Sequence, residues 1–145
     1  MKPILHRKSI VRVSIIAFAA VLWFSCTQEK EEICIAGNGG TVRLVLFPEH
    51  HGEPVTSNFN HPDTAFIKFN AQDFPGDDPS KYDLVIAGAV GSDSVVVENL
   101  KCGNYYLYMA GFDTSIAERV RGGIPYVISE DASGTKKVIV PVTED

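Results

Sequence analysis

The sequence predicts an all-β fold, a single β-sandwich of about seven strands over residues 33–145. Short runs rich in β-branched and aromatic residues recur along residues 33–145, and clusters of Gly, Pro, Asn and Asp separate them. No sustained helical period of apolar residues interrupts this rhythm, and short strands at such spacing are typical of a sandwich. The expected strands are residues 41–47, 64–70, 82–87, 94–98, 105–112, 124–129 and 136–143.

Residues 1–25 are expected to be a signal peptide. Four basic residues and no acidic residue accompany an apolar run over residues 13–24, and the small Ser25 ends the segment. A basic start, a short apolar centre and a small residue at the cut define a secretory signal. The apolar run is shorter than the roughly 20 residues that a membrane-spanning helix needs, although a retained helix is the alternative interpretation.

Cys26 is the expected lipidation site. The sequence Leu22-Trp23-Phe24-Ser25-Cys26 resembles a lipobox, in which the cysteine thiol takes a diacylglycerol and the chain is cut before it. Trp23 and Phe24 depart from the tight motif, where smaller aliphatic residues are usual, and looser boxes of this kind are similar to those of Bacteroidetes lipoproteins. The resemblance implies a protein of the cell envelope, held in the outer membrane by fatty acyl chains.

Residues 26–32 are expected to be a polar, acidic tether. They also resemble the acidic signal that sends Bacteroidetes lipoproteins to the cell surface. The domain itself is then expected to span residues 33–145.

The first half of that domain alternates strands with polar loops. Residues 41–47 (TVRLVLF) are expected to form the first strand, and residues 64–70 (TAFIKFN) alternate apolar and polar side chains, which indicates one buried face. Residues 48–63 are expected to be a long loop with three of the four histidines, and residues 71–81 a second polar loop.

The second half contains three further strands in close succession, residues 82–87, 94–98 and 105–112, with short turns between them. Residues 113–123 are expected to be irregular, with room for one helical turn. The strands at 124–129 and 136–143 follow. Pro141 lacks an N–H, so the last strand is expected at a sheet edge.

Residues 95–107 (VVVENLKCGNYYL) carry a second resemblance. The apolar strand followed by Leu100, Gly103 and Tyr105 in a Leu-x-x-Gly-x-Tyr pattern is similar to carboxypeptidase-regulatory-like and transthyretin-like domains. The resemblance implies a single prealbumin-like Greek-key β-sandwich, following the cleaved lipoprotein signal peptide, in which the glycine turns the chain and the tyrosine begins an inner strand. It implies no chemistry, because one fold hosts many functions. The chain also lacks the C-terminal Tyr-Arg-Gly-Ser motif of the transthyretin-like hydrolases.

Charge and cysteine content restrict the partners and the compartment. Four of the 13 Lys and Arg and none of the 18 Asp and Glu lie in residues 1–25, which leaves nine basic against 18 acidic residues. This acidity argues against nucleic acid as a partner. With Cys26 used by lipid, Cys34 and Cys102 remain, either as a disulfide or as two buried thiols.

Metal binding is a weak expectation from the loops. His50, His51, His61 and Asp63 lie within one loop and offer zinc ligands, whereas the acidic loop offers Asp73, Asp77 and Asp78 to calcium. Adjacent residues of a strand point to opposite faces, so His50 and His51 could share an ion only if the loop bends. Solvated loops are the alternative, and no cofactor is expected.

Exposed tyrosine is the other candidate feature. Tyr106 and Tyr108 are expected on one face of their strand and Tyr105 on the other, so an outward tyrosine face could stack on sugar or on a protein. The serines and histidines show no nucleophile signature. The leading hypothesis is a non-enzymatic, lipid-anchored binding or accessory module for an envelope protein or glycan. The alternatives are a small metal-dependent hydrolase using residues 50–63, and a structural spacer.

Overall fold

The computed structural model describes residues 34–144 and confirms the predicted all-β fold. The leader, Cys26 and the tether lie outside the described residues. Within 34–144 no helix is long and apolar enough to cross a membrane. The elements are β1 (Asn38–His50), β2 (Glu53–Pro54), β3 (Thr64–Phe69), the 3₁₀ turn η1 (Pro79–Lys81), β4 (Leu84–Ala87), β5 (Val95–Leu100), β6 (Gly103–Asp113), β7 (Glu118–Ile128) and β8 (Gly134–Glu144).

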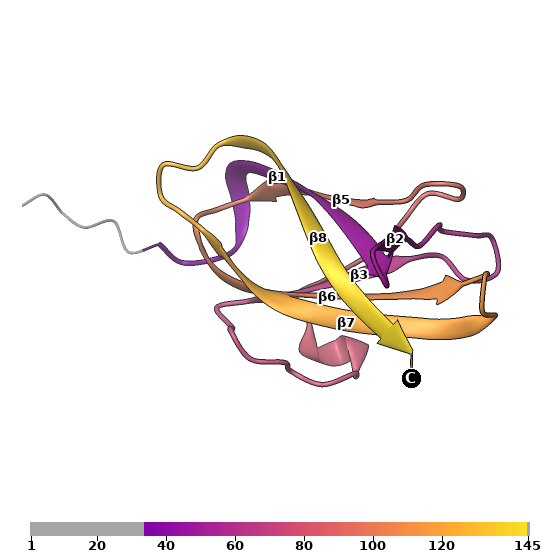
Figure 1. The fold of residues 1–145 in the computed structure, drawn as a ribbon. Helices are drawn as coiled ribbons and strands as arrows, with labels where there is room; N and C mark the ends of the chain where they lie inside the picture. The colour runs from indigo at the N-terminus through magenta and orange to yellow at the C-terminus, as the bar shows by residue number, and fades with distance from the viewer. Residues whose placement is uncertain (1–33, 145) are drawn as a thin grey trace, which may run out of the picture. The chain divides into compact units, whose positions relative to one another are not determined.

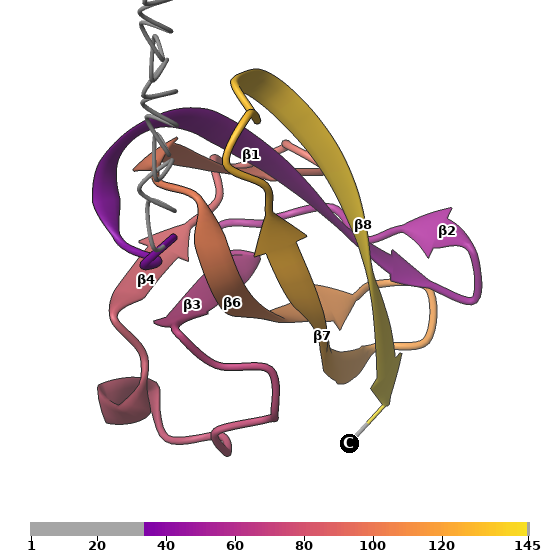
Figure 2. The ribbon, with the colours of Figure 1, turned by 90° about the vertical axis from the view of Figure 1, so that its left-hand side faces the viewer.

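The strands form two layers that β8 joins. One layer contains β2, β1 and β5, and the other contains β7, β6, β3 and β4 in that order. Strand β8 pairs with β1 along most of its length and with β7 at its end, so it crosses from one layer to the other (Figures 1 and 2). The sandwich is therefore one strongly curled mixed sheet.

The pairing of β1 with β8 is parallel and continuous from Val42↔Gly134 to His50↔Val142. All the other strand pairs are antiparallel among the described residues. A parallel pair needs a crossover connection, and here nearly the whole domain serves as that crossover. The end of β1 consequently lies beside the end of β8.

The core fills the space between the layers with aliphatic side chains in period-two rows, because successive residues of a strand face opposite sides. Each buried Leu, Ile or Val contributes roughly 1.5–3 kcal/mol relative to exposure. The hydrophobic residues that are at most 1% exposed are Val42, Leu44, Leu46, Ala65, Ile67, Val95, Val97, Leu100, Tyr105, Leu107, Met109, Val120 and Val140.

Cys34 and Cys102 form a disulfide, with their Cα atoms 5.1 Å apart. It joins the start of the described chain to the turn between β5 and β6. Tyr105 completes this junction. Its hydroxyl donates to the Lys101 carbonyl at 2.7 Å and accepts from the Gly37 amide at 3.1 Å. Gly103, at φ 139°, leaves no space for a Cβ against Ala36. In this chain the glycine of the Leu-x-x-Gly-x-Tyr pattern thus permits close packing, and the tyrosine satisfies backbone groups of the same junction.

Three sequence predictions about the strands are corrected. Strand β1 continues through Pro48 to His50, so the long loop begins three residues later than expected. Residues 118–123, expected to be irregular, belong to β7. The glycines of this segment serve packing, since a Cβ at Gly122 would collide with the Pro141 carbonyl oxygen.

The edge position expected for the last strand is also wrong, because β8 lies between β1 and β7. Its pairing with β7, however, covers only Thr143 and Glu144. Pro141 therefore lies where β8 is paired on one side alone, which is the local condition that a missing N–H requires.

Removing the Tyr105 hydroxyl should destabilise the domain. Tyr105→Phe leaves the Lys101 carbonyl and the Gly37 amide without their partner, and such a loss costs about 1–3 kcal/mol. Denaturant unfolding with the disulfide intact measures the change. Tyr126→Phe is the control, because no hydrogen bond of its hydroxyl is recorded within residues 34–144. Equal stability of the two variants would contradict the assigned role.

Candidate functional site

The turn after β1 brings His50 and His51 together. His50 pairs with Glu53 of β2, so His51 and Gly52 form a two-residue hairpin loop with φ values of 50° and 82°. Positive φ at both central residues defines a type I′ turn, and histidine tolerates this region better than most residues. The chain therefore has the bend that His50 and His51 need in order to face the same side. The two imidazole rings lie 4.2 Å apart between centroids.

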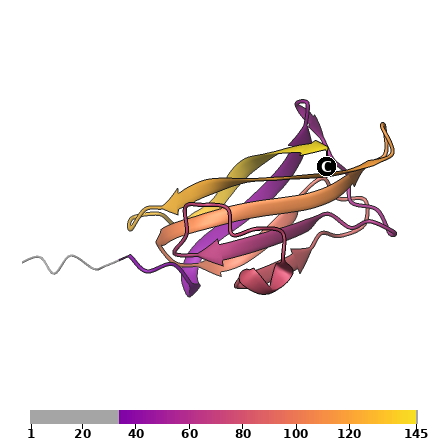
Figure 3. The same cartoon turned by 90° about the horizontal axis from the view of Figure 1, so that it is seen from below.

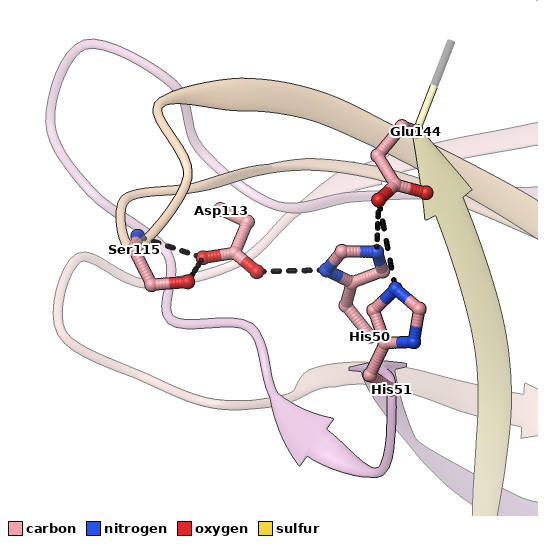
Figure 4. A network of polar contacts seen from close by, with 5 residues as sticks. All are labelled: His50, His51, Asp113, Ser115 and Glu144. Carbon is pink, nitrogen blue, oxygen red and sulfur yellow. Dashed lines mark hydrogen bonds and ion pairs between the residues drawn. The ribbon is translucent and has the colours of Figure 1, made fainter.

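His50 is held from the core side by Asp113, the last residue of β6. Its Nδ1 lies 2.8 Å from the Asp113 Oδ2. The other carboxylate oxygen accepts hydrogen bonds from the Ser115 amide at 2.8 Å and hydroxyl at 2.6 Å (Figure 4). Asp113 is thereby fixed on both sides, and it fixes the orientation of the His50 ring.

Glu144, at the end of β8, faces the opposite edge of the same ring. Its Oε1 lies 3.3 Å from the His50 Nε2 and 3.5 Å from the His51 Nε2 (Figure 4). His50 is only 5% exposed, and its Nε2 makes no hydrogen bond of acceptable geometry. By contrast, the side chains of His51 and Glu144 are 76% and 43% exposed. The cluster is therefore buried at His50 and open to solvent at His51 and Glu144.

The charges of the cluster reinforce one another. The hydrogen bond with Asp113 raises the pKa of His50 above its ordinary value. Hydrogen bonds from Ser115 and His50 lower the pKa of Asp113 to about 2. A hydrogen bond from its own backbone amide and contact with His50 lower the pKa of Glu144. Both carboxylates are therefore ionised around neutral pH, and Asp113 can only accept from His50 Nδ1.

This arrangement is not a catalytic triad. In a triad the histidine lies between the nucleophile and the acid. Here the Ser115 hydroxyl donates to Asp113, on the far side of the acid from His50. The groups at His50 Nε2 in the described chain are Glu144 and His51, neither of which is an activated hydroxyl or thiol.

The remaining predicted ligands do not join the cluster. His61 stacks on Phe112, with ring centroids 4.4 Å apart. In the loop 70–83, Asp77 accepts from Tyr108 and pairs with Arg121, while Asp78 caps η1 through the Ser80 amide. Asp73 is an exposed residue of the same loop. Within residues 34–144, the group of donors close enough to share an ion is His50, His51 and Glu144.

Asp63 is buried in a way that the sequence did not suggest. It is 0% exposed, and neither carboxylate oxygen has a hydrogen-bond partner in the described chain. Its Oδ1 occupies the space where a Cβ of Gly111 would stand. Burial raises the pKa of Asp63 to about 7. The loop 55–63 thus places an acid against the end of β6, two residues before Asp113.

The tyrosine face is corrected by the structure. Tyr106 and Tyr108 do share one face, and Tyr105 does point into the core. The outward pair is covered rather than exposed, since the two residues are 9% and 5% accessible. The loop 70–83 with η1 lies over this side of the second layer (Figure 3). It packs Tyr82 and Phe74 against Tyr108, at 5.8 and 5.1 Å between centroids.

Asp113 and Glu144 were missed by sequence reasoning, although their strands contain the signal. Each ends a row of inward-facing residues, Tyr105-Leu107-Met109-Gly111-Asp113 in β6 and Val138-Val140-Val142-Glu144 in β8. His50 ends the corresponding row of β1. A polar group at the inward end of an apolar row marks a candidate site, but its partners depend on strand pairing. Comparison with protein-family models, curated proteins and solved structures found no match for this chain.

Asp63→Asn should stabilise the domain more as the pH rises. The folded carboxyl has its pKa near 7 and the unfolded one near 3.8. Between these values the folded chain holds a proton that the unfolded chain has lost, so wild-type stability falls by up to about 1.4 kcal/mol per pH unit. The neutral amide removes this dependence. Denaturant unfolding at about pH 5 and about pH 8 measures it. Asp93→Asn, at an exposed position, is the control, and a pH-independent gain for Asp63→Asn would contradict the prediction.

Proposed function

We propose that this chain is a lipid-anchored cell-envelope protein whose β-sandwich is a non-enzymatic binding module for a protein partner. The address rests on the leader and on Cys26. The disulfide between Cys34 and Cys102 supports it, because such bonds persist in oxidising compartments outside the cytoplasm.

The observation that carries the binding role is a set of exposed apolar side chains at one end of the sandwich. Phe59, Val90 and Ile116 are 85%, 64% and 44% exposed. They lie in the loops that follow β2, β4 and β6. These loops lie at the end of the sandwich where β1 ends (Figure 1). Solvent-exposed aromatic and aliphatic groups gathered on loops are typical of contact surfaces.

The loops after β2 and β4 are hydrogen-bonded to each other, and the first of them also packs against β6. The Ser57 amide donates to the Ser92 carbonyl at 2.9 Å, and the Gly91 amide donates to the Ser57 carbonyl at 2.8 Å. Asp63, from the same loop as Phe59, contacts Gly111 near the end of β6. A surface fixed in this way loses little conformational freedom on binding.

The position of the anchor favours the same end. The tether enters the domain at Cys34, beside the turn between β5 and β6, whereas β1 runs away from that junction for 13 residues. From Val42, which pairs with Leu100, the strand advances eight residues to His50, roughly 26 Å at about 3.3 Å per residue. The loop end is therefore the end of the described domain that lies away from Cys34.

The structure weakens the two other binding hypotheses. Stacking of a glycan on the Tyr106 and Tyr108 face would require the loop 70–83 to move away. The hydrolase hypothesis drew its ligands from residues 50–63, but His61 stacks on Phe112 and Asp63 is buried, so neither joins His50 and His51. A protein partner is the occupant that the exposed loop residues fit.

Cys26→Ala should abolish anchoring. Without the thiol, no diacylglycerol can be attached, and the chain should incorporate no labelled fatty acid and leave the membrane fraction. Metabolic labelling and fractionation measure both effects. A variant that combines Cys34→Ala with Cys102→Ala keeps Cys26 and should stay labelled. If Cys26→Ala remains in the membrane fraction, residues 13–24 are a retained helix and the anchoring proposal is wrong.

Crosslinking from the loop end should capture a protein partner. A photo-crosslinking amino acid in place of Phe59 should give an adduct of defined mass in intact cells. The same amino acid in place of Ile139, which is 56% exposed on β8, is the matched control. An adduct at both positions, an adduct at neither, or one removed by glycosidases would each overturn the choice of a protein partner at this surface.

A further inference from the structure

We propose that His50, His51 and Glu144 form a binding site for a divalent transition metal ion of the zinc class, with Asp113 as the residue that orients His50. This inference goes beyond the partner-binding role and does not require it. It follows from the geometry of four side chains that three distant parts of the chain supply (Figure 4).

The first argument is the direction of the His50 ring. Two hydrogen bonds from Ser115 fix one carboxylate oxygen of Asp113, and the other lies 2.8 Å from the His50 Nδ1, where it accepts a hydrogen bond from that nitrogen. In the neutral imidazole, the Nε2 lone pair then points away from Asp113 and toward Glu144. A carboxylate behind a ligating histidine is the usual outer partner of a protein-bound metal, because it fixes the tautomer and raises the basicity of the ring.

The second argument is the incomplete bonding of the His50 Nε2. His50 is 5% exposed, and its Nε2 lies 3.3 Å from the Glu144 Oε1 but makes no hydrogen bond of acceptable geometry in the described chain. Buried polar atoms are otherwise almost always paired. An ion bound between the rings and Glu144 would satisfy this atom and would neutralise the carboxylate facing it.

The third argument is distance. Zinc ligands lie about 2.0–2.2 Å from the ion, so two ligands of a tetrahedral ion are about 3.4 Å apart. Glu144 Oε1 lies 3.3 Å from the His50 Nε2 and 3.5 Å from the His51 Nε2. The donor atoms of all three residues lie within 4.8 Å of one another. A rotation of the exposed His51 ring would bring its donor closer without moving the backbone.

The donor set selects the class of ion. Two imidazole nitrogens and one carboxylate oxygen suit zinc, copper or nickel, whereas calcium and magnesium prefer oxygen ligands alone. Three protein ligands leave one coordination position of a tetrahedral ion open. The exposed rim at His51 and Glu144 gives water or another ligand access to that position.

A structural role of His50 is the competing explanation. A protonated His50 could bridge Asp113 and Glu144 as an ion pair without any metal. The two explanations differ at His51, which is 76% exposed and contributes to a metal site but is dispensable to the ion pair. His51 is therefore the residue on which the test depends.

The test uses the full chain, purified in detergent without a polyhistidine tag and treated with chelator. Calorimetric titration with zinc chloride should show one ion per chain for the wild type. His51→Asn and Glu144→Gln should each weaken binding at least tenfold, and Asp113→Asn should weaken it about 10–100-fold through His50. His61→Asn, which removes a histidine outside the cluster, should bind as the wild type does.

Folding is checked separately by circular dichroism, and thermal unfolding should shift upward with zinc only in chains that bind it. His51→Asn and Glu144→Gln alter exposed side chains, so both should fold. Absence of stoichiometric binding by the wild type would overturn the proposal, as would equal binding by His51→Asn. Neither result bears on crosslinking from Phe59, so failure of the metal site and failure of the partner-binding role are distinguishable.

Discussion

The parallel pairing of β1 with β8 is the constraint on which the rest of the structure depends. It joins the first strand to the last, from Val42 to His50 on one side and from Gly134 to Val142 on the other. Because β8 then reaches β7, the same strand closes both layers around the core. It also sets a register that places Glu144 beside His50, although 94 positions separate them in the sequence.

The two ends of the sandwich are finished in different ways. At the end near Cys34, the disulfide joins the start of the described chain to the turn between β5 and β6, and the Tyr105 hydroxyl satisfies the Gly37 amide and the Lys101 carbonyl. At the loop end, His50 Nε2 and the Asp63 carboxylate are buried without hydrogen-bond partners in the described chain. Proteins tolerate such local costs mainly where function requires them, so the asymmetry indicates the loop end as the functional one.

Sequence reasoning reached the fold class, the positions of most strands and the opposite faces of Tyr105 and Tyr106, because these depend on local period and turn residues. It failed where tertiary contacts override a local signal. Residues 118–123 were expected to be irregular, yet they belong to β7, where Gly122 and Gly123 permit close packing. It also found His50 and His51 but neither Asp113 nor Glu144. The local pattern shows that Asp113 and Glu144 each end an inward-facing row. Only the pairing of β1 with β8 and the position of β6 show that these two rows end beside His50.

The convergence also explains why His51 adopts a positive φ at the tip of the first hairpin. A regular strand would carry its side chain to the face opposite His50. The type I′ turn reverses that direction within two residues, so both rings face Glu144. A Gly or Asn in place of His51 would satisfy the turn with less strain. A histidine at this position therefore makes more sense as a ligand than as a turn residue, and the hairpin geometry supports a site for an ion rather than an incidental cluster.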